Sequence, residues 1–175
     1  MPIFDHILRH SAPSEMDFAQ QRQWMVEHQL RDWGICDPLV LDAMGRVPRA
    51  RFVPERQRQA AYYAGALPIG EGQTISQPFV VAHMTEMLRL RGDEKVLEVG
   101  TGSDYQAAVL AFLAREVHTV ERISRLAARA QAVLDELGLD VVHIHIGDGR
   151  QGWLAAAPYN ELLVACGSPQ VPPPL

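Results

Sequence analysis

The chain has 175 residues, of which 47% are hydrophobic and 21% charged, and these values predict one soluble globular domain with a sizeable core. Its net charge of -5, without a run of Lys or Arg, argues against a nucleic-acid-binding surface, and the lack of a long apolar stretch argues against a membrane span. Two cysteines far apart in sequence, Cys36 and Cys166, and an N-terminus without a signal peptide predict a cytoplasmic location.

The first half of the chain, residues 1–92, is predicted to be mainly helical. Ser14 and Asp17 have the spacing of a capping box, which predicts a helix from there to about Trp33, ended by Gly34. Three further helices are expected: one after the N-cap and first-turn pair Asp37-Pro38 to about Gly45, one from Pro54 to Tyr62, and one from Pro78 to Leu90.

Residues 64–77 join two of these helices through a segment that contains Gly and Pro. The segment is long for a connection in a compact domain, and loops of this length are usually lids, binding loops or disordered. Its Ile, Thr and Gln content argues against disorder. We therefore expect residues 64–77 to form a lid or binding loop.

From Glu94 on, short apolar segments alternate with helical ones. This alternation predicts a parallel sheet with right-handed crossovers, and hence an α/β core over residues 93–175 of a single domain. The expected strands are 95–100, 116–121, 141–146 and 161–165, and the expected helices are 105–114 and 123–137.

The run Lys95–Tyr105 combines an apolar strand, a turn at Gly100 and Gly102, and the start of a helix. A strand, a glycine turn and a helix N-terminus together form a cradle for a nucleoside-bearing cofactor. The dinucleotide fingerprint requires a third glycine where this chain has Tyr105, so nicotinamide and flavin cofactors are disfavoured. A plain strand–helix turn is the alternative interpretation of the same residues.

Two acidic residues strengthen the ligand-binding interpretation. Glu121 ends the second expected strand, where a carboxylate can accept from both hydroxyls of a ribose. Asp148 lies between Gly147 and Gly149 at the end of the third, where it can accept from an exocyclic amine such as that of adenine. No phosphate-binding loop with its lysine is present, so a nucleoside without phosphates fits best.

Longer motifs extend from about Arg22 to the C-terminus. They are Arg49-x-x-Phe-Val-Pro54, Pro68-Ile-Gly-x-Gly-Gln-Thr-Ile-Ser-Gln-Pro78, Met84-Thr-Glu86, Val96-Leu-Glu-Val-Gly-Thr-Gly-Ser103, Gln106-Ala-Ala-Val-Leu-Ala111, Thr119-Val-Glu-Arg122 and Gly147-Asp-Gly149. Together they resemble the bacterial protein-L-isoaspartate O-methyltransferases. The Gln-Thr-Ile-Ser-Gln-Pro segment is specific to that family, whereas the glycine turn alone would fit any S-adenosylmethionine methyltransferase.

The resemblance implies a Rossmann-like methyltransferase core that transfers a methyl group from S-adenosyl-L-methionine to the α-carboxylate of L-isoaspartyl residues in damaged proteins. It implies that Ser76 is the active-site hydroxyl, and that the substrate is bound by Gln73, Thr74 and Ile75. The cofactor-binding residues it implies are Gly100, Thr101, Gly102, Ser103, Glu121, Asp148 and Gly149.

The residues present are consistent with this chemistry. The nucleophile is a carboxylate, which is ionised at neutral pH and requires no general base. Ser76 would donate a hydrogen bond to that carboxylate and orient it; it lacks the Gly-x-Ser-x-Gly context of a hydrolase nucleophile. The alternative role for Ser76 is an N-cap of the helix that begins at Pro78.

The sequence departs from the family at three points. Asp104 replaces a glycine, where it could cap the helix, repel the cofactor's carboxylate, face its ammonium or sulfonium group, or be strained by a positive φ. Asn160 replaces an Asp before the fourth strand, with a mild expected effect. The chain stops after strand 161–165, which predicts an incomplete sheet, an exposed apolar edge and self-association through it.

Two other functions remain open on the sequence. A truncated, non-catalytic remnant would bind the cofactor or an isoaspartyl peptide weakly, and a small-molecule methyltransferase is disfavoured by the Gln73–Ser76 segment. No metal site is predicted: His143 and His145 share one face of a strand, but no third ligand is visible beside them.

Overall fold

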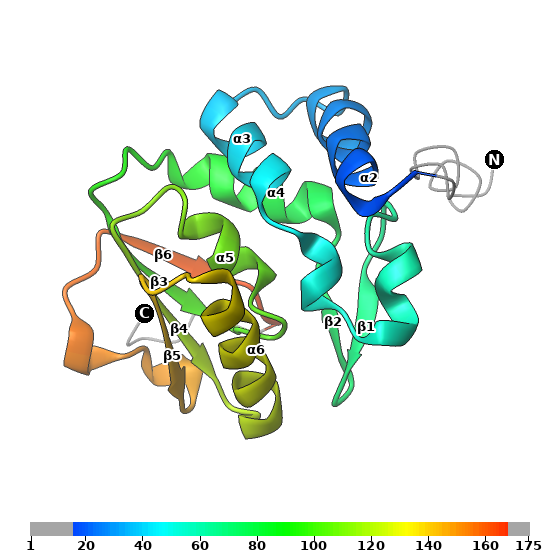
Figure 1. Cartoon of the computed structure of the whole chain (residues 1–175). Coiled ribbons are helices and arrows are strands. Elements are labelled where there is room, and N and C mark those ends of the chain that lie inside the picture. Colours follow the sequence, from blue (N-terminus) through cyan, green and yellow to red (C-terminus); the bar gives the residue numbers. More distant parts are fainter. Residues whose placement is uncertain (1–15, 168–175) are drawn as a thin grey trace. The chain divides into compact units, whose positions relative to one another are not determined.

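The computed structural model describes residues 16–167 (Figure 1). The chain divides into two compact units, with the boundary between Met87 and Leu88. Within the described residues, no helix is long and apolar enough to cross a membrane.

The first unit begins with a capped helix. Asp17 accepts a hydrogen bond from the Gln20 backbone N–H (2.8 Å), and the Gln20 side chain accepts from the Asp17 N–H (3.1 Å). The capping box is therefore formed by Asp17 and Gln20. The sequence predicts Ser14 and Asp17, with Asp17 as the second member of the pair; Ser14 lies outside the described residues. Helix α2 (Phe18–Met25) continues directly as the π-helix η1 (Val26–Arg31).

The predicted start of the next helix is confirmed. Asp37 accepts from the Leu39 N–H at 2.8 Å and Pro38 occupies the first helical position. The carboxylate of Glu86 accepts from the backbone N–H groups of Cys36 and Asp37, both at 2.7 Å, and so links two helices of this unit. The remaining helices are α3 (Pro38–Arg46), the 3-10 helices η2 (Arg49–Phe52) and η3 (Glu55–Ala60), and α4 (Pro78–Leu88).

The segment predicted as a loop is a β-hairpin. Strands β1 (Leu67–Gly70) and β2 (Gln73–Ile75) pair antiparallel. The turn residues Glu71 and Gly72 both have positive φ, as the preferred two-residue hairpin turns require. The strands were not predicted because they are only four and three residues long, too short for alternation of polar and apolar residues to reveal them. The binding role expected for residues 64–77 stays a prediction.

The second unit contains the predicted parallel sheet. Its strand order is β5-β4-β3-β6, which places β6 at one end among the described strands. Figure 1 shows these strands side by side, with α5 and α6 beside them. The bounds are β3 Lys95–Val99, α5 Tyr105–Leu110, β4 Glu116–Glu121, α6 Ser124–Leu137, β5 Val142–Ile146 and β6 Glu161–Val164. The α/β fold is thus confirmed, with strand ends within one residue of those predicted.

One face of this sheet is covered by the chain between β5 and β6. Leu97, Val99 and Val120 form its apolar core, and Trp153 and Tyr159 pack against them. This connection includes the short 3-10 helices η4 (Gly149–Gln151) and η5 (Leu154–Ala156).

Asn160 fastens the end of that connection. Its side-chain oxygen accepts a hydrogen bond from the Lys95 backbone N–H, and its backbone N–H donates to the Lys95 carbonyl, both at 2.8 Å. These two hydrogen bonds hold the start of β6 beside the start of β3.

Candidate functional site

The glycine turn closes tightly on the end of β4. The N–H groups of Gly100 and Thr101 donate to the Val120 carbonyl at 3.0 and 3.4 Å. Gly100 has a φ of +102°, and a Cβ there would lie 3.0 Å from the Cβ of Cys166. Glycine is therefore required at position 100 by backbone conformation and by packing.

Glu121 is held rigidly at the carboxyl end of β4. One carboxylate oxygen accepts from the Gly102 N–H (2.8 Å) and the other from the Ile123 N–H (2.9 Å). The residue is 6% exposed. Each oxygen retains acceptor capacity, so the carboxylate is fixed in place with lone pairs available to a ligand.

A hollow of about 500 Å³ lies at the carboxyl ends of β4 and β5. Its lining residues are Arg122, Ile146, Gly147, Asp148 and Arg150. Ile146 is 62% exposed, so the hollow offers an apolar side chain next to polar ones. This is the edge of a parallel sheet at which ligands of α/β proteins bind.

Asp148 borders this hollow but has a partner of its own. The Arg150 guanidinium contacts both carboxylate oxygens, with the shortest N···O distance at 2.6 Å. This hydrogen bonding lowers the pKa of Asp148 to about 2, so the carboxylate is ionised. Gly149 follows, and a Cβ there would lie 2.4 Å from a methyl group of Val99, so glycine is required by packing.

Thr101 and Ser103 point to protein partners. The Thr101 hydroxyl lies 2.7 Å from that of Thr119, which in turn donates to the buried carboxyl of Glu98 at 2.8 Å. The Ser103 hydroxyl accepts from the Tyr105 N–H at 3.4 Å, near the start of α5. These side chains, together with the Asp104 N–H that donates to the Thr101 carbonyl at 2.7 Å, organise the turn.

Asp104 lies at the N-cap position of α5, but its side chain does not cap the helix. It has a φ of +71°, and its side chain makes no capping hydrogen bond. Within the described residues, neither carboxyl oxygen has a hydrogen-bond partner. Burial, and secondarily the charge of Glu98, raises the pKa of Asp104 well above its usual value.

Glu98 shares this buried environment. Burial raises the pKa of Glu98 to about 8, against the hydrogen bond from Thr119, which lowers it. Two neighbouring carboxyl groups beneath the glycine turn thus favour their neutral forms.

The predicted substrate residues lie on the hairpin of the first unit. Gln73 and Thr74 are exposed on β2, whereas Ile75 is buried. The Ser76 carbonyl accepts from the Arg49 guanidinium at 2.7 Å, and Arg49 also donates to the Ala61 carbonyl at 2.7 Å.

Arg49 was not identified as a site residue from the sequence. Arginine side chains are almost never fully buried unless paired, but Arg49 is 0% exposed. Its side chain fixes the backbone at Ser76 from inside the unit. The only sequence signal is its place in the Arg49-x-x-Phe-Val-Pro54 motif.

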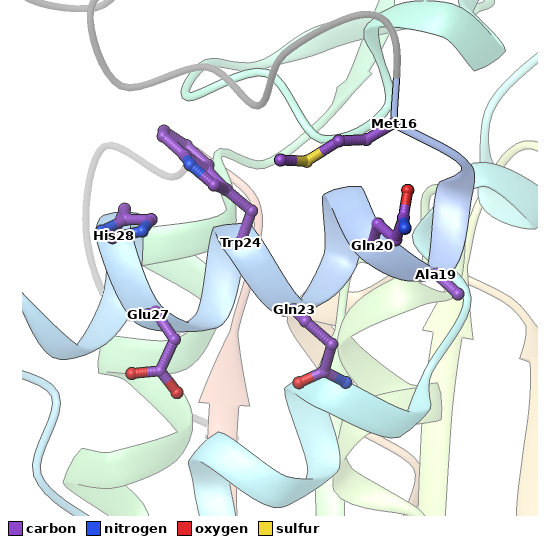
Figure 2. A pocket seen from close by; sticks show the side chains of 7 residues that line it. All are labelled: Met16, Ala19, Gln20, Gln23, Trp24, Glu27 and His28. Carbon is purple, nitrogen blue, oxygen red and sulfur yellow. The ribbon is translucent and has the colours of Figure 1, made fainter.

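A second hollow contains none of the predicted site residues. It is an open, mainly apolar depression along α2 and η1 (Figure 2). Figure 2 shows the side chains of Trp24 and Met16 on one side of the helix ribbon and those of Glu27 and Gln23 on the other. We assign no role to this depression.

Comparisons with known proteins agree with these observations. The sequence model of "Protein-L-isoaspartate(D-aspartate) O-methyltransferase (PCMT)" matches residues 20–175. A protein-L-isoaspartate O-methyltransferase 1 of Rhodopseudomonas palustris is 54% identical over 155 residues, which cover 89% of this chain and 63% of that relative. The chain thus spans less than two thirds of that relative's length.

Two solved structures have a similar fold. A protein-L-isoaspartate O-methyltransferase superimposes with a TM-score of 0.78 at 26% identity, over 89% of this chain and 50% of the other. A Plasmodium falciparum protein described as a protein-L-isoaspartate O-methyltransferase, solved in complex with S-adenosyl-L-homocysteine, superimposes with a TM-score of 0.74 at 20% identity, over 86% of this chain and 76% of the other. The chain belongs to the protein-L-isoaspartate(D-aspartate) O-methyltransferase family.

Proposed function

We propose that the second unit binds S-adenosyl-L-methionine at the carboxyl ends of β3, β4 and β5. The observation that carries this proposal is the fixed Glu121 carboxylate beside an open hollow that holds both an apolar and an acidic side chain. These residues fit a nucleoside: Glu121 would accept from the ribose hydroxyls, and the exposed Ile146 would lie against the base. The cofactor supplies an activated methyl group.

Asp148 would accept from the exocyclic amine of the base. To do so, it has to exchange hydrogen bonds with Arg150, which contacts both of its oxygens. Both groups are exposed, so this exchange costs little. Arg150 would then remain at the rim of the hollow.

We further propose that the methyl acceptor is the α-carboxylate of L-isoaspartyl residues in damaged proteins. The acceptor would contact β2, whose exposed Gln73 and Thr74 precede Ser76. The Ser76 hydroxyl would donate to the carboxylate and orient it, while Arg49 holds the backbone of Ser76 in place.

The proposed reaction requires little acid–base chemistry from the protein. A carboxylate is already ionised at neutral pH, so the residues have to align it and exclude water. Alignment of this kind can supply about 7–11 kcal/mol of a reaction barrier. The absence of a general base among the residues proposed here is consistent with such a role.

Two measurements on this chain test the proposal. Calorimetry should show one S-adenosylhomocysteine bound per chain. Transfer of labelled methyl from S-adenosylmethionine should then be detected on an isoaspartyl peptide, and not on the same peptide with ordinary aspartate. Ser76→Ala should lower transfer about 10- to 100-fold, the value of one hydrogen bond to a charged group, without changing cofactor affinity.

The outcomes separate the alternatives. Binding without transfer would favour the non-catalytic remnant. A folded sample that neither binds nor transfers would refute the proposal. An equal loss of cofactor affinity and transfer in Ser76→Ala would contradict the role given to its hydroxyl.

A cytoplasmic location and self-association stay predictions. Among the described strands, β6 lies at the end of the sheet and presents the half-buried Leu162 and Val164. Such edges pair with other chains when left uncovered. Sedimentation velocity over a range of concentrations would reveal self-association, and an unchanged monomer would contradict it.

A further inference from the structure

Four polar side chains gather on one face of the sheet, away from the glycine turn. Glu116 and His118 come from β4, and His143 and His145 from β5. Side chains two apart on a strand share a face, and the parallel register places His118 beside His143. One potential ligand atom from each of Glu116, His118 and His143 lies within 4.8 Å of the others.

The donor atoms converge on a single oxygen. Glu116 Oε1 lies 2.8 Å from His118 Nε2 and 3.9 Å from His143 Nε2. Around a tetrahedral zinc ion, with bonds of about 2.0–2.2 Å, ligand atoms are about 3.3 Å apart. The two observed distances bracket that separation, and the donor atoms of His118 and His143 lie within 4.8 Å of each other, so side-chain rotations would bring the three donors onto one ion.

The buried ligand has the outer contact that metal-bound histidines usually have. His118 Nδ1 lies 2.8 Å from His145 Nε2, and the His145 ring stacks on Trp153 with centroids 4.2 Å apart. With Nε2 of His118 facing the ion, Nδ1–H would donate to His145, which fixes the ring's tautomer and orientation.

The other two proposed ligands, Glu116 and His143, differ in their surroundings. Lys95 Nζ lies 3.5 Å from Glu116 Oε2, the second oxygen of the carboxylate. Its ammonium group also weakens the attraction for a cation, which limits affinity. The His143 side chain is 45% exposed, so an ion can reach it from solvent.

We propose that Glu116, His118 and His143 form a binding site for a divalent transition-metal ion of the zinc type. Imidazole and carboxylate donors suit zinc, cobalt, nickel and copper better than magnesium or calcium, and three protein ligands leave a position for water. Because Glu116 begins β4 and Glu121 ends it, the site lies roughly 16 Å from the proposed cofactor contact. The ion would clamp β5, the end strand, to β4.

Zinc chloride and cobalt(II) chloride titrated into the untagged chain test this proposal. His6 and His10 are replaced by Gln in every sample, so that these N-terminal imidazoles contribute nothing. We expect one ion per chain, a cobalt absorption spectrum typical of tetrahedral coordination, and a melting temperature that rises with zinc. Magnesium chloride should produce none of these effects.

Matched variants assign the ligands. His143→Ala removes a half-exposed ligand, so the fold should persist while zinc affinity falls at least 100-fold. His145→Ala should lower affinity about 10- to 100-fold, as the loss of an outer contact does. His83→Ala, on α4 of the first unit, serves as the control and should change nothing.

Three results would overturn the proposal. These are a folded chain that binds no zinc, zinc binding that survives in His143→Ala, and an equal loss of affinity in His83→Ala. Since S-adenosylhomocysteine binding is not part of the experiment, its outcome is independent of the proposed function.

Discussion

Glu121, at the end of β4, and Asp104, in the glycine turn that Glu121 contacts, are both buried acidic residues, and their environments are opposite. Both oxygens of Glu121 accept from backbone N–H groups. Both oxygens of Asp104 lack a hydrogen-bond partner among the described residues, and its backbone has a positive φ. A carboxyl group is thus hydrogen-bonded at Glu121 and costly at Asp104.

The difference indicates what each residue contributes. A carboxylate fixed by two N–H groups is preorganised for a ligand, because no further ordering is required on binding. A buried carboxyl without partners favours its neutral form, and a neutral Asp104 would not repel the carboxylate of a bound cofactor. The cost of Asp104 therefore falls on folding more than on binding.

The largest effect is expected for Glu121→Ala. Two N–H groups would lose a charged acceptor, which costs about 3 kcal/mol of unfolding free energy. The ribose contact would be lost as well, so affinity for S-adenosylhomocysteine should fall about 100-fold or more. Urea denaturation measures the unfolding free energy, and calorimetry measures the affinity for S-adenosylhomocysteine. An unchanged affinity would show that Glu121 does not contact the cofactor.

Asp104→Gly should have a smaller effect of opposite sign. Removing the positive-φ strain and the unpartnered carboxyl should raise the unfolding free energy by about 2 kcal/mol, after the entropic cost of glycine. Asp104→Asn, which keeps the strain, is the matched control and should gain less. A loss of stability in Asp104→Gly would mean that the carboxyl has a favourable role.

The pH dependence of stability should report the buried carboxyls. Because burial raises the folded-state pKa of Glu98 to about 8, the folded chain binds more protons than the unfolded one, and stability falls as pH rises toward 8. His145 affects stability in the opposite direction: burial lowers its folded-state pKa to about 4, so stability rises as pH rises from about 4 to about 6.5. Above about pH 6.5 this gain in stability is nearly complete.

Between about pH 6.5 and about pH 8 we therefore expect Glu98 to cost the parent chain roughly 1 kcal/mol, and Asp104, whose pKa is also raised, to add a loss of the same sign. Glu98→Gln should reduce this slope, and the remainder should come from Asp104. Urea denaturation at both pH values measures it, and a parent whose stability rises over this interval would contradict the neutral state of Glu98.

The smallest effect is expected at Asn160, where an amide stands in place of the family's acid. A carboxylate can accept the same hydrogen bond from the Lys95 N–H, so Asn160→Asp should change stability by less than about 0.5 kcal/mol. Asn160→Ala should cost about 1 kcal/mol. Thermal melting distinguishes the two, and equal losses would show that the side-chain oxygen contributes nothing.

The sheet could be predicted from the sequence because its strands are apolar runs bounded by glycines and acids. The expected strand 116–121 coincides with β4, and the expected strand 161–165 differs from β6 by one residue. Both depend on local patterns, which a sequence displays directly.

Features that depend on pairing could not be predicted. The proposed metal site needs the register that brings His118 beside His143, and strand spacing alone does not specify this. The buried Arg49 resembled a surface arginine, because its carbonyl partners Ala61 and Ser76 are far from it in sequence. The hairpin was missed because its strands are short.

The most direct test of the proposed cofactor site is a map of backbone amide NMR shifts during titration with S-adenosylhomocysteine. The largest changes should occur at Gly102, Glu121 and residues 146–149, which line or anchor the hollow at the strand ends. Changes confined to the depression along α2 and η1, or no changes in a folded sample, would contradict this account.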